Sequence, residues 1–323
     1  MAKKKQHYSG IGGQAVLEGV MMRNQNLTAV ACRKPDREIE IEVEEYHGLL
    51  EGTVWRKLPF VRGVFSFIDS LILAVKSLNF SASVFAEEED PKAAKQQKKD
   101  GNGSDALFMG ITTVISFVIA IGIFMLLPYF LTQLIGGVLR SQSVLSILEG
   151  VIRIAIFLLY ITAISAMKDI RRLYQYHGAE HKCINCIESG RPLTVANVKQ
   201  ATRFHKRCGT SFIIFVMLVS VILFFFIRVD GPFMRILLRI LLIPVIAGIS
   251  FELIRLAGRS SNPVVQLLSA PGLWMQRITT REPDESMIEV AIASVEAVFD
   301  WRAYLADEFG YDERKLDRVD TWS

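Results

Sequence analysis

Residues 106–139 carry no charged side chain, and this run restricts the possible folds more than any other feature of the sequence. About 20 apolar residues suffice for a helix that crosses a bilayer. Three further apolar segments follow at residues 146–167, 209–227 and 233–254. Hydrophobic residues make up 51% of the 323-residue chain, and the mean hydropathy of +0.31 is high for a soluble protein. We therefore expect a polytopic α-helical membrane protein with four transmembrane helices and a small cytoplasmic α+β portion.

Several polar residues interrupt these apolar segments. Pro128 lacks a backbone N–H and is expected to kink or end the first helix. Glu149 and Arg153 are four residues apart and can form an ion pair near the far end of the second helix. Arg235 and Arg239 in the fourth segment are expected to extend their charged ends outward to the membrane surface.

Basic residues are distributed unevenly among the loops that connect these helices. Cytoplasmic loops of membrane proteins are enriched in Lys and Arg, which predicts the orientation of the chain. The loop after the first helix has Arg140, and the loop after the third has Arg228 and Arg235. The segment between the second and third helices has nine: Lys168, Arg171, Arg172, Lys182, Arg191, Lys199, Arg203, Lys206 and Arg207. We expect an inner-membrane protein whose two termini and residues 168–207 are cytoplasmic.

Composition divides the chain into five regions. The N-terminal region contains glycines and a stretch of alternating apolar and acidic residues. The second region is amphipathic, and the third is rich in charged residues. The last region becomes polar again after the fourth apolar segment, and residues 284–309 have the apolar periodicity of a helix. The expected regions are a cytoplasmic glycine-rich loop and β-hairpin (1–59), an interfacial helix (60–86), a charged linker (87–105), a four-helix membrane domain with a cytoplasmic His/Cys loop at 168–208 (106–259), and a cytoplasmic helical segment (260–323).

The N-terminal region contains one clear strand signal. Ile39, Ile41 and Val43 alternate with glutamates, which is typical of a half-buried strand with one solvated face. Residues 27–32 are expected to form its partner strand, in which Cys32 is a small core residue. Glycines at residues 9–23 favour a loop, and their spacing matches no phosphate-binding motif.

Residues 177–186 concentrate the metal-binding chemistry of the chain. His177 and His181 are four residues apart, so they share one face of a helix. Glu180 completes the pattern H-x-x-E-H, which is the order found in inverted zincins. In that chemistry the two histidines bind zinc, and the glutamate is the general base. Zn²⁺ is the expected cofactor, and Glu180 is the expected catalytic residue.

The remaining ligands are open at this point. His205 and Cys208 form a second pair, expected on a helix from Val195 to Cys208 that Thr194 caps. A closed structural zinc site could use Cys183, Cys186, His205 and Cys208, and a mixed site could use His177, His181, His205 and Cys208. If the second helix continued straight beyond Met167, His177 would lie about 15 Å from Met167 along the helix axis. The two pairs can meet only if the chain bends after Arg172, and Gly178 is the expected bend.

Four further polar residues are candidates for the site. Gln14, Glu18 and Arg23 lie in or beside the glycine-rich stretch. Glu252 lies near the cytoplasmic end of the fourth apolar segment, where a carboxylate is costly unless it is paired or functional. It could be a distant third zinc ligand, or it could pair with Arg255 three residues later.

Three motifs resemble the YqhQ-like family of bacterial membrane proteins, described as predicted metal-dependent enzymes. They are Gly12–Arg23 (GGQAVLEGVMMR), His177–Lys182 (HGAEHK) and Arg207–Ser211 (RCGTS). With the four-helix layout, the resemblance covers nearly the whole chain. It implies that the glycine-rich stretch matters for the site. The family pattern has proline before Arg207, where this chain has Lys206.

These observations predict a membrane-embedded, metal-dependent hydrolase with its His/Glu/Cys site at the cytoplasmic face. The alternative is a membrane scaffold or assembly factor in which a structural zinc holds the cytoplasmic hairpin together. A transporter with Glu149 and Glu252 as functional carboxylates is a third interpretation, although the four segments show no repeat. The lipid bilayer is the expected partner, and binding to a membrane protein or a second copy is open. The net charge of +4 predicts no nucleic-acid partner.

Overall fold

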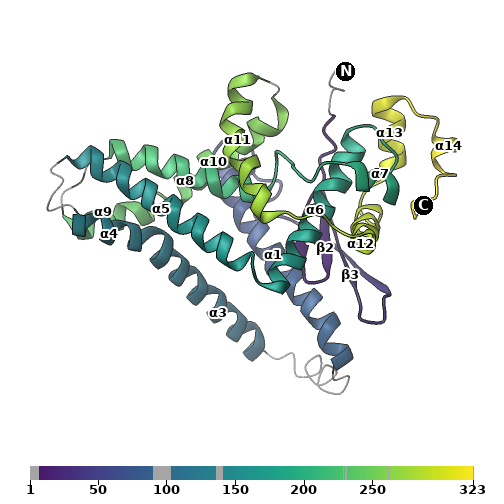
Figure 1. The fold of residues 1–323 in the computed structure, drawn as a ribbon, viewed down its shortest axis with the longest axis horizontal. Helices are drawn as coiled ribbons and strands as arrows, with labels where there is room; N and C mark the ends of the chain where they lie inside the picture. Colours follow the sequence, from purple (N-terminus) through teal and green to yellow (C-terminus); the bar gives the residue numbers. More distant parts are fainter. Residues whose placement is uncertain are drawn as a thin grey trace.

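Long helices extend to one side of a four-stranded sheet in this protein (Figure 1). A computed structural model describes residues 7–89, 103–135, 141–227, 229, 231–260 and 262–322. Most of the predicted linker 87–105 lies outside these residues. The elongated side, called here the apolar bundle, contains α3 to α5 and α8 to α10.

Several helices of the apolar bundle are long and apolar enough to span a membrane. The first span, Gly110–Ile135, combines α3 (Gly103–Ile121), a π-helical turn (Gly122–Leu126) and α4 (Leu127–Ile135). The second and third are Ser143–Ile164 of α5 (Gln142–Ile164) and α8 (Gly209–Phe226). The predicted fourth helix is two helices bent by 41°, α9 (Pro232–Leu241) and α10 (Ile243–Arg259). The described residues thus contain three such spans, or four if the bent pair is one.

Pro128 distorts the first span without ending it. The chain widens into the π-helical turn directly before the proline, where the N–H of Leu127 donates to the carbonyl of Gly122. Proline cannot donate to the preceding turn and its ring crowds that turn, so a wider turn relieves the clash. The helix continues through α4 to Ile135.

A buried ion cluster joins three helices of the apolar bundle. The predicted pair is present, with Arg153 Nη2 2.7 Å from Glu149 Oε1. Arg239 Nη2 lies 2.6 Å from the other Glu149 oxygen, and Arg153 also donates to Ser220 Oγ at 2.7 Å. The prediction that Arg239 extends outward is therefore wrong, because a buried carboxylate on α5 pairs with it. Arg235 lies nearer the start of α9, where it donates to a backbone carbonyl.

The N-terminal region is a four-stranded antiparallel meander. Its strands are β1 (Gly12–Val16), β2 (Gly19–Asn24), β3 (Leu27–Arg33) and β4 (Ile39–Glu45), paired in that order. The predicted pairing of residues 27–32 with the glutamate-rich strand is confirmed. The loop expected at residues 9–23 is instead a tight hairpin, in which Glu18 takes the positive φ of 47° that the turn requires.

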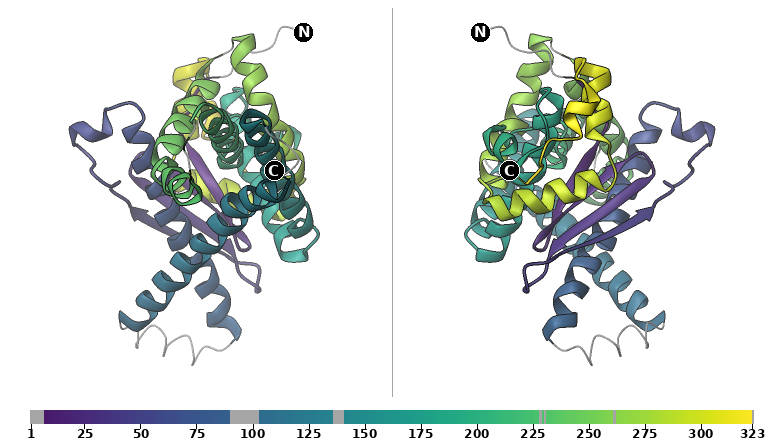
Figure 2. Two further views of the ribbon diagram at one scale, coloured as in Figure 1. Left: turned by 90° about the vertical axis from the view of Figure 1, so that its left-hand side faces the viewer. Right: turned by 90° about the vertical axis from the view of Figure 1, so that its right-hand side faces the viewer.

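The two faces of the sheet pack against different helices. One face contributes Val16, Met21, Val30 and Cys32 to a core with α1 (Val61–Glu89). The other contributes Val20, Met22, Ala29 and Ala31 to a core with α6 (Lys168–Glu188) and α12 (Glu285–Glu296). Figure 2 shows α12 crossing the strands on this second face. Of β4, Ile39 packs against the second core, but Ile41 and Val43 are 43% and 49% exposed. The predicted half-buried alternation is therefore wrong for the rest of β4.

The helix that carries the His/Cys motif changes direction before its first residue. α5 ends at Ile164, and residues 165–167 form a break after which α6 runs without interruption to Glu188. The bend is therefore at Ser165–Met167 and not at Gly178. Gly178 instead permits close packing, because a Cβ there would lie 2.0 Å from the carbonyl oxygen of Arg281.

The segment after α6 contains less helix than expected. Thr194 caps α7 as predicted, accepting from the N–H of Asn197 at 3.2 Å, but α7 covers only Val195–Gln200. Residues 201–208 are irregular, so His205 and Cys208 do not share a helix face. Cys208 is the N-cap of α8, which confirms that it adjoins the third apolar helix.

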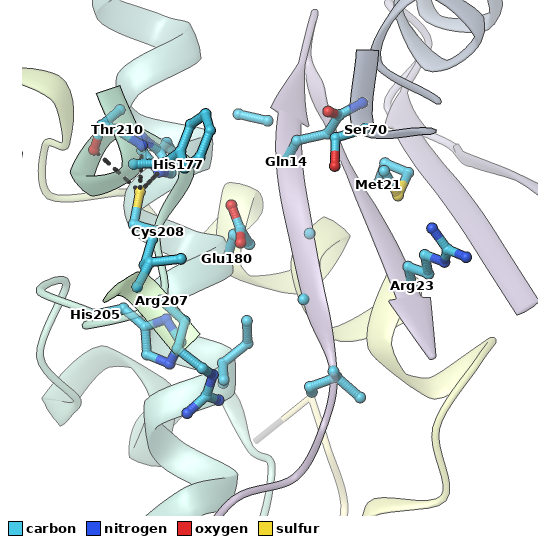
Figure 3. Close-up of a pocket in the computed structure, with 18 of the residues that line it drawn as sticks. Gln14, Met21, Arg23, Ser70, His177, Glu180, His205, Arg207, Cys208 and Thr210 are labelled. Atoms are coloured by element: carbon cyan, nitrogen blue, oxygen red, sulfur yellow. Dashed lines mark hydrogen bonds between the residues drawn. The ribbon is translucent and has the colours of Figure 1, made fainter. Parts of the chain in front are cut away.

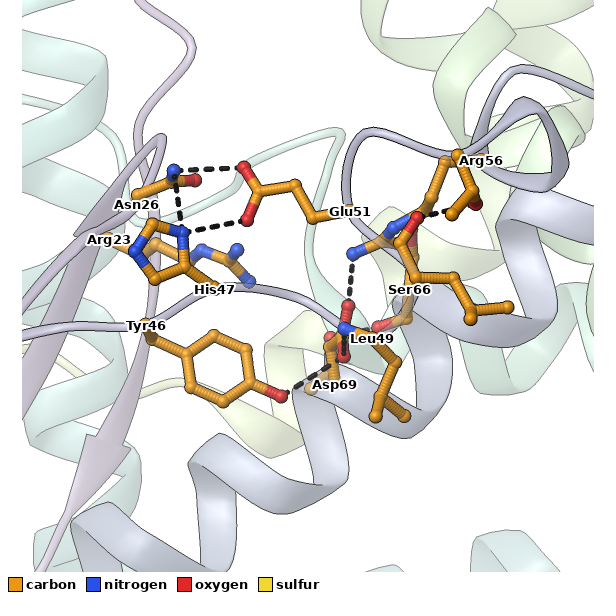
Figure 4. Close-up of polar contacts among 12 residues, drawn as sticks. Arg23, Asn26, Tyr46, His47, Leu49, Glu51, Arg56, Ser66 and Asp69 are labelled. Atoms are coloured by element: carbon orange, nitrogen blue, oxygen red, sulfur yellow. Dashed lines mark hydrogen bonds and ion pairs between the residues drawn. The ribbon is translucent and has the colours of Figure 1, made fainter.

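The segment before α1 is held by one buried carboxylate. Asp69 is 1% exposed and pairs with Arg56 of a short 3₁₀ helix (η1, Val54–Arg56). It also accepts from the N–H of Leu49 at 2.9 Å and from the hydroxyl of Tyr46 at 3.0 Å (Figure 4). These contacts tie the end of the sheet and the following loop to α1.

The C-terminal region contains α11 (Pro263–Thr279), α12, α13 (Trp301–Phe309) and α14 (Glu313–Leu316). The single helix predicted at 284–309 is interrupted after Glu296, and Asp300 caps the new helix. α11 packs against α8 and lies across the direction of the apolar bundle (Figure 1). Its apolar side chains Val264, Leu267 and Leu268 are at least 50% exposed. α11 therefore exposes more apolar surface than is expected of a cytoplasmic helix.

Candidate metal centre

Two helices bring three potential metal ligands together. α6 supplies His177 and His181 from adjacent turns, and Cys208 stands at the start of α8. One ligand atom from each residue lies within 4.8 Å of the others. Among the residues that the structure describes, this is the one group of three or more His, Cys, Asp or Glu side chains with that spacing. Figure 3 shows Glu180 between Cys208 and the strand that carries Gln14.

Backbone carbonyls orient both imidazoles. His177 Nδ1 lies 2.9 Å from the carbonyl oxygen of Thr279, and His181 Nδ1 lies 2.7 Å from that of Arg203. Each Nδ1 therefore carries the proton and donates, which leaves Nε2 as the lone-pair atom. His177 Nε2 is 3.1 Å from Cys208 Sγ, and His181 Nε2 is buried without a hydrogen bond. Metal-binding histidines in proteins typically have this arrangement.

Burial and local charge favour the ligand forms of these groups. Burial lowers the pKa of His181 to about 4, so its imidazole is neutral at physiological pH. Burial alone would raise the pKa of Cys208, but His181 and Thr210 interact with the thiolate and lower it overall. Thr210 contributes both its hydroxyl, 3.1 Å from the sulfur, and its backbone N–H. Neutral imidazole and thiolate are the forms that bind zinc.

Glu180 is buried beside the three ligands. Burial raises the pKa of its carboxyl group to about 8, and this effect is opposed by His177 and by a hydrogen bond from the backbone of Gly13. Its Oε2 atom is buried and has no hydrogen-bond partner. A buried carboxyl oxygen without a hydrogen-bond partner can accept a hydrogen bond from a proton donor that enters the site.

A cavity of about 790 Å³ opens beside these residues. The start of β1 forms one wall, α1 forms another, and α6 with the adjoining ends of α8 and α10 completes it. His177, Glu180 and Cys208 all line it, so a molecule in the cavity would contact the Glu180 carboxyl group and two of the three potential ligands.

His205 lies beside the cluster and not in it. Its ring centroid is 5.5 Å from that of His181, and its Nε2 atom is 3.8 Å from Glu188 Oε2. Glu188 is fully buried, and its pKa is lowered to about 2 because His205 and Arg207 outweigh the effect of burial. The mixed four-ligand site that includes His205 is therefore not assembled.

The predicted Cys3His site is also not assembled. Cys183 and Cys186 face the core between α6 and α12, where burial raises the pKa of the Cys186 thiol to about 12. Cys186 Sγ is 3.5 Å from the carbonyl oxygen of Pro192, away from Cys208. The apolar side chains of α6 that follow His181 thus belong to the hydrophobic core with both thiols, and Cys186 is corrected to a core residue.

The glycine-rich stretch contributes to the cavity in different ways. Gln14 lines it, and its side-chain nitrogen is buried without a hydrogen-bond partner. Arg23 lines the part of the cavity farthest from Cys208 in Figure 3. Glu18 lies in the β1–β2 turn, where it pairs with Arg172 and accepts from the hydroxyl of Tyr176. Glu18 therefore joins the hairpin to α6 and is not beside the ligands.

Glu252 forms an ion pair and lies outside the cluster of three potential ligands. Arg62 contacts it through two nitrogens, at 2.7 Å and 2.5 Å, and the N–H of Phe60 donates at 3.3 Å. The ion-pair partner of Glu252 is thus Arg62 and not the expected Arg255. This pair fixes the start of α1 to the middle of α10.

Gly13, Thr279 and Arg203 act in the site through their backbones. Of these, only Gly13 has a sequence signal, since it belongs to the glycine-rich motif of the family. The carbonyls of Thr279 and Arg203 carry no signal, because any residue type would supply them. Thr279 is the last residue of α11 and Arg203 follows α7, and the positions of both helices depend on packing between segments distant in the sequence.

Comparison with known proteins places the chain in a family. A family profile described as "Protein of unknown function (DUF1385)" matches residues 58–301. The chain belongs to this family. A relative, "Uncharacterized protein YqhQ" of Bacillus subtilis (strain 168), is 37% identical over 287 residues, which cover 88% of this chain and 90% of the relative. The resemblance inferred from the motifs is therefore confirmed. The DUF1385 match includes all three clustered ligands, and no solved structure matches the chain.

Proposed function

We propose that this protein is an integral membrane hydrolase that depends on zinc, with His177, His181 and Cys208 as ligands and Glu180 as general base. The observation that carries the proposal is the orientation of the two histidines. Each donates Nδ1–H to a carbonyl and so keeps Nε2 as a lone-pair atom, and His177 Nε2 lies 3.1 Å from the cysteine sulfur. One oxygen of the Glu180 carboxyl group beside them is buried without a hydrogen-bond partner. A purely structural packing role does not require an orphaned buried carboxylate.

The donor set suits zinc in a catalytic site. Three protein ligands from His and Cys, with a fourth position left for solvent or substrate, are typical of catalytic zinc, whereas structural sites are closed by four. When bound, a zinc ion in such a site activates water and polarises an ester or amide carbonyl. The set of three protein ligands therefore favours the hydrolase over the zinc-stapled scaffold.

Glu180 is the residue that moves the proton. Its carboxylate form is favoured by any cation beside it, which opposes the effect of burial on its pKa. In that form Oε2 accepts a proton from the attacking water and can return it to the leaving group. Gly13 holds the carboxyl group while this happens.

The apolar bundle is the membrane part of the proposal. Their length and apolar composition support spanning by α3–α4, α5 and α8, and the nine basic residues of 168–207 support a cytoplasmic site. The first turn of α8 follows Cys208 directly, so the site lies at the boundary between the bilayer and the cytoplasm.

Metal content and cellular function, measured together, test the proposal. His177→Ala, His181→Ala and Cys208→Ser should each lower zinc per purified protein by at least tenfold, because each removes a direct ligand. Glu180→Gln should keep zinc and fail to complement a deletion strain. Cys186→Ser is the matched control and should keep both zinc and function. Full complementation by Glu180→Gln with zinc lost from Cys186→Ser would favour the scaffold instead.

A further inference from the structure

The cavity beside the ligands has a region lined by the ligand residues, called here the polar end, an apolar wall, called here the apolar end, and further polar residues that include Arg23 and Ser70. His177, Glu180 and Cys208 line the polar end. The apolar wall is built where three helices meet, and its residues are Phe67 of α1, Phe212 and Ile213 of α8, and Phe251 and Ile254 of α10. Phe67 and Phe212 contact each other with ring centroids 5.3 Å apart. A ligand that fills the cavity would therefore need both a polar group and an apolar body.

We infer that the cavity binds a single-chain acyl amphiphile taken from the bilayer, with its ester group beside Glu180. This substrate class rests on the proposed function, because the ester is placed where the hydrolytic groups lie. Ile213 is 39% exposed and belongs to the first turns of the α8 span, so the apolar end adjoins the region that lipid would occupy. An acyl chain could enter there without leaving an apolar environment.

The size of the cavity favours an acyl chain over a helical membrane peptide. The cavity holds about 790 Å³, which is in the range typical of small-molecule sites.

The edge of β1 does not favour an extended peptide either. An added peptide strand needs free backbone groups along a sheet edge. β1 is an edge strand, but the backbone of Gly13 already hydrogen bonds to Glu180, and α6 packs along this strand. Gly12 leaves open space, since a Cβ there would meet nothing within 4 Å. Gly12 is among the residues that line the cavity, so a large side chain there can extend into it.

Photo-crosslinking of the full-length protein in phosphatidylcholine nanodiscs tests the inference. The probe is a lysophosphatidylcholine with a diazirine in its acyl chain, and mass spectrometry locates the crosslinks. They should fall on the cavity-facing peptides of α1, α8 and α10. Ile213→Trp and Gly12→Phe, which fill the cavity from opposite sides, should each lower this crosslinking at least fivefold. Ile222→Trp is the matched control, because Ile222 is on α8 but 57% exposed, and it should leave crosslinking unchanged.

The outcomes separate the substrate from the catalytic proposal. Equal crosslinking in all three variants, or capture of a hydrophobic diazirine peptide in the cavity in place of the lipid, would overturn the inference. Zinc content and a single elution peak verify that each variant is folded. Binding needs no turnover, so Glu180→Gln should crosslink like the wild type. If lipid binding fails while Glu180→Gln still abolishes cellular function, the hydrolase stands with another substrate.

Discussion

The backbone of Gly13 holds Glu180, and the position leaves no room for a side chain. A Cβ there would lie 2.5 Å from the carbonyl oxygen of Met21, 2.8 Å from Met22 Sδ and 3.2 Å from Glu180 Cγ. Gly13→Ala must therefore displace β1 from β2 or move the carboxyl group, at a cost of about 1–3 kcal/mol. We expect normal zinc content with at least tenfold lower function, measured by complementation and metal analysis.

Gly12→Ala is the control for that substitution. Gly12 is adjacent to Gly13, but a Cβ there meets nothing within 4 Å. We expect wild-type zinc content and wild-type function from this variant. Equal losses from Gly12→Ala and Gly13→Ala would show that the glycines act on the strand as a whole and not on Glu180.

The helical spacing of His177, Glu180 and His181 was sufficient to predict three of the residues that meet at the site. Cys208 was one of several alternatives, because its distance from α6 depends on the break at residues 165–167. That break contains neither Gly nor Pro, so the local residue types do not predict it. Cys186 was misplaced because its orientation depends on the core that α6 forms with α12, and such packing has no signature in spacing alone.

At the scale of elements, the ion cluster of Glu149, Arg153 and Arg239 joins α5 to α9. Glu149→Ala would leave two buried guanidinium groups without their carboxylate. Breaking a buried pair in this way costs about 3–5 kcal/mol. We expect a lower midpoint of thermal unfolding in detergent, with zinc content unchanged below the transition because the cluster is remote from the ligands.

Ser220→Ala is the matched control, since it removes one hydrogen bond to Arg153 and keeps both ion pairs. This substitution should lower the free energy of unfolding by about 1 kcal/mol. If Glu149→Ala lowers the stability no more than Ser220→Ala does, Glu149 contributes little to helix packing. Sequence spacing predicted the pair within α5, but Arg239 comes from a helix 86 residues away from Arg153, and only packing brings it close.

At the scale of the whole molecule, α1 and α11 lie where the apolar bundle meets the sheet (Figure 1). Sequence predicted α1 as an interfacial helix from Asp69 and Lys76, and that remains a prediction. Asp69 is buried by the segment before α1, so its charge does not require contact with water. α11 lies in the helical segment expected at 260–323, but the sequence does not predict its bounds, because its two prolines and one glycine are typical of a broken segment and the packing of α11 on α8 has no local signal.

Cysteine labelling of intact cells tests the orientation of the whole chain. All four native cysteines are buried, so an exposed engineered cysteine should dominate the reaction with a membrane-impermeant maleimide. Ser141→Cys lies at the start of α5, in the region with few basic residues, and should react in intact cells. Lys199→Cys replaces a side chain that is 64% exposed in the basic segment, and it should react only after the cells are opened. The positive-inside rule gives this expectation, because the segment 168–207 has nine basic residues and would be costly to translocate. Labelling of Lys199→Cys in intact cells, with Ser141→Cys protected, would place the metal centre outside the cytoplasm, in a compartment where thiols such as Cys208 are open to oxidation.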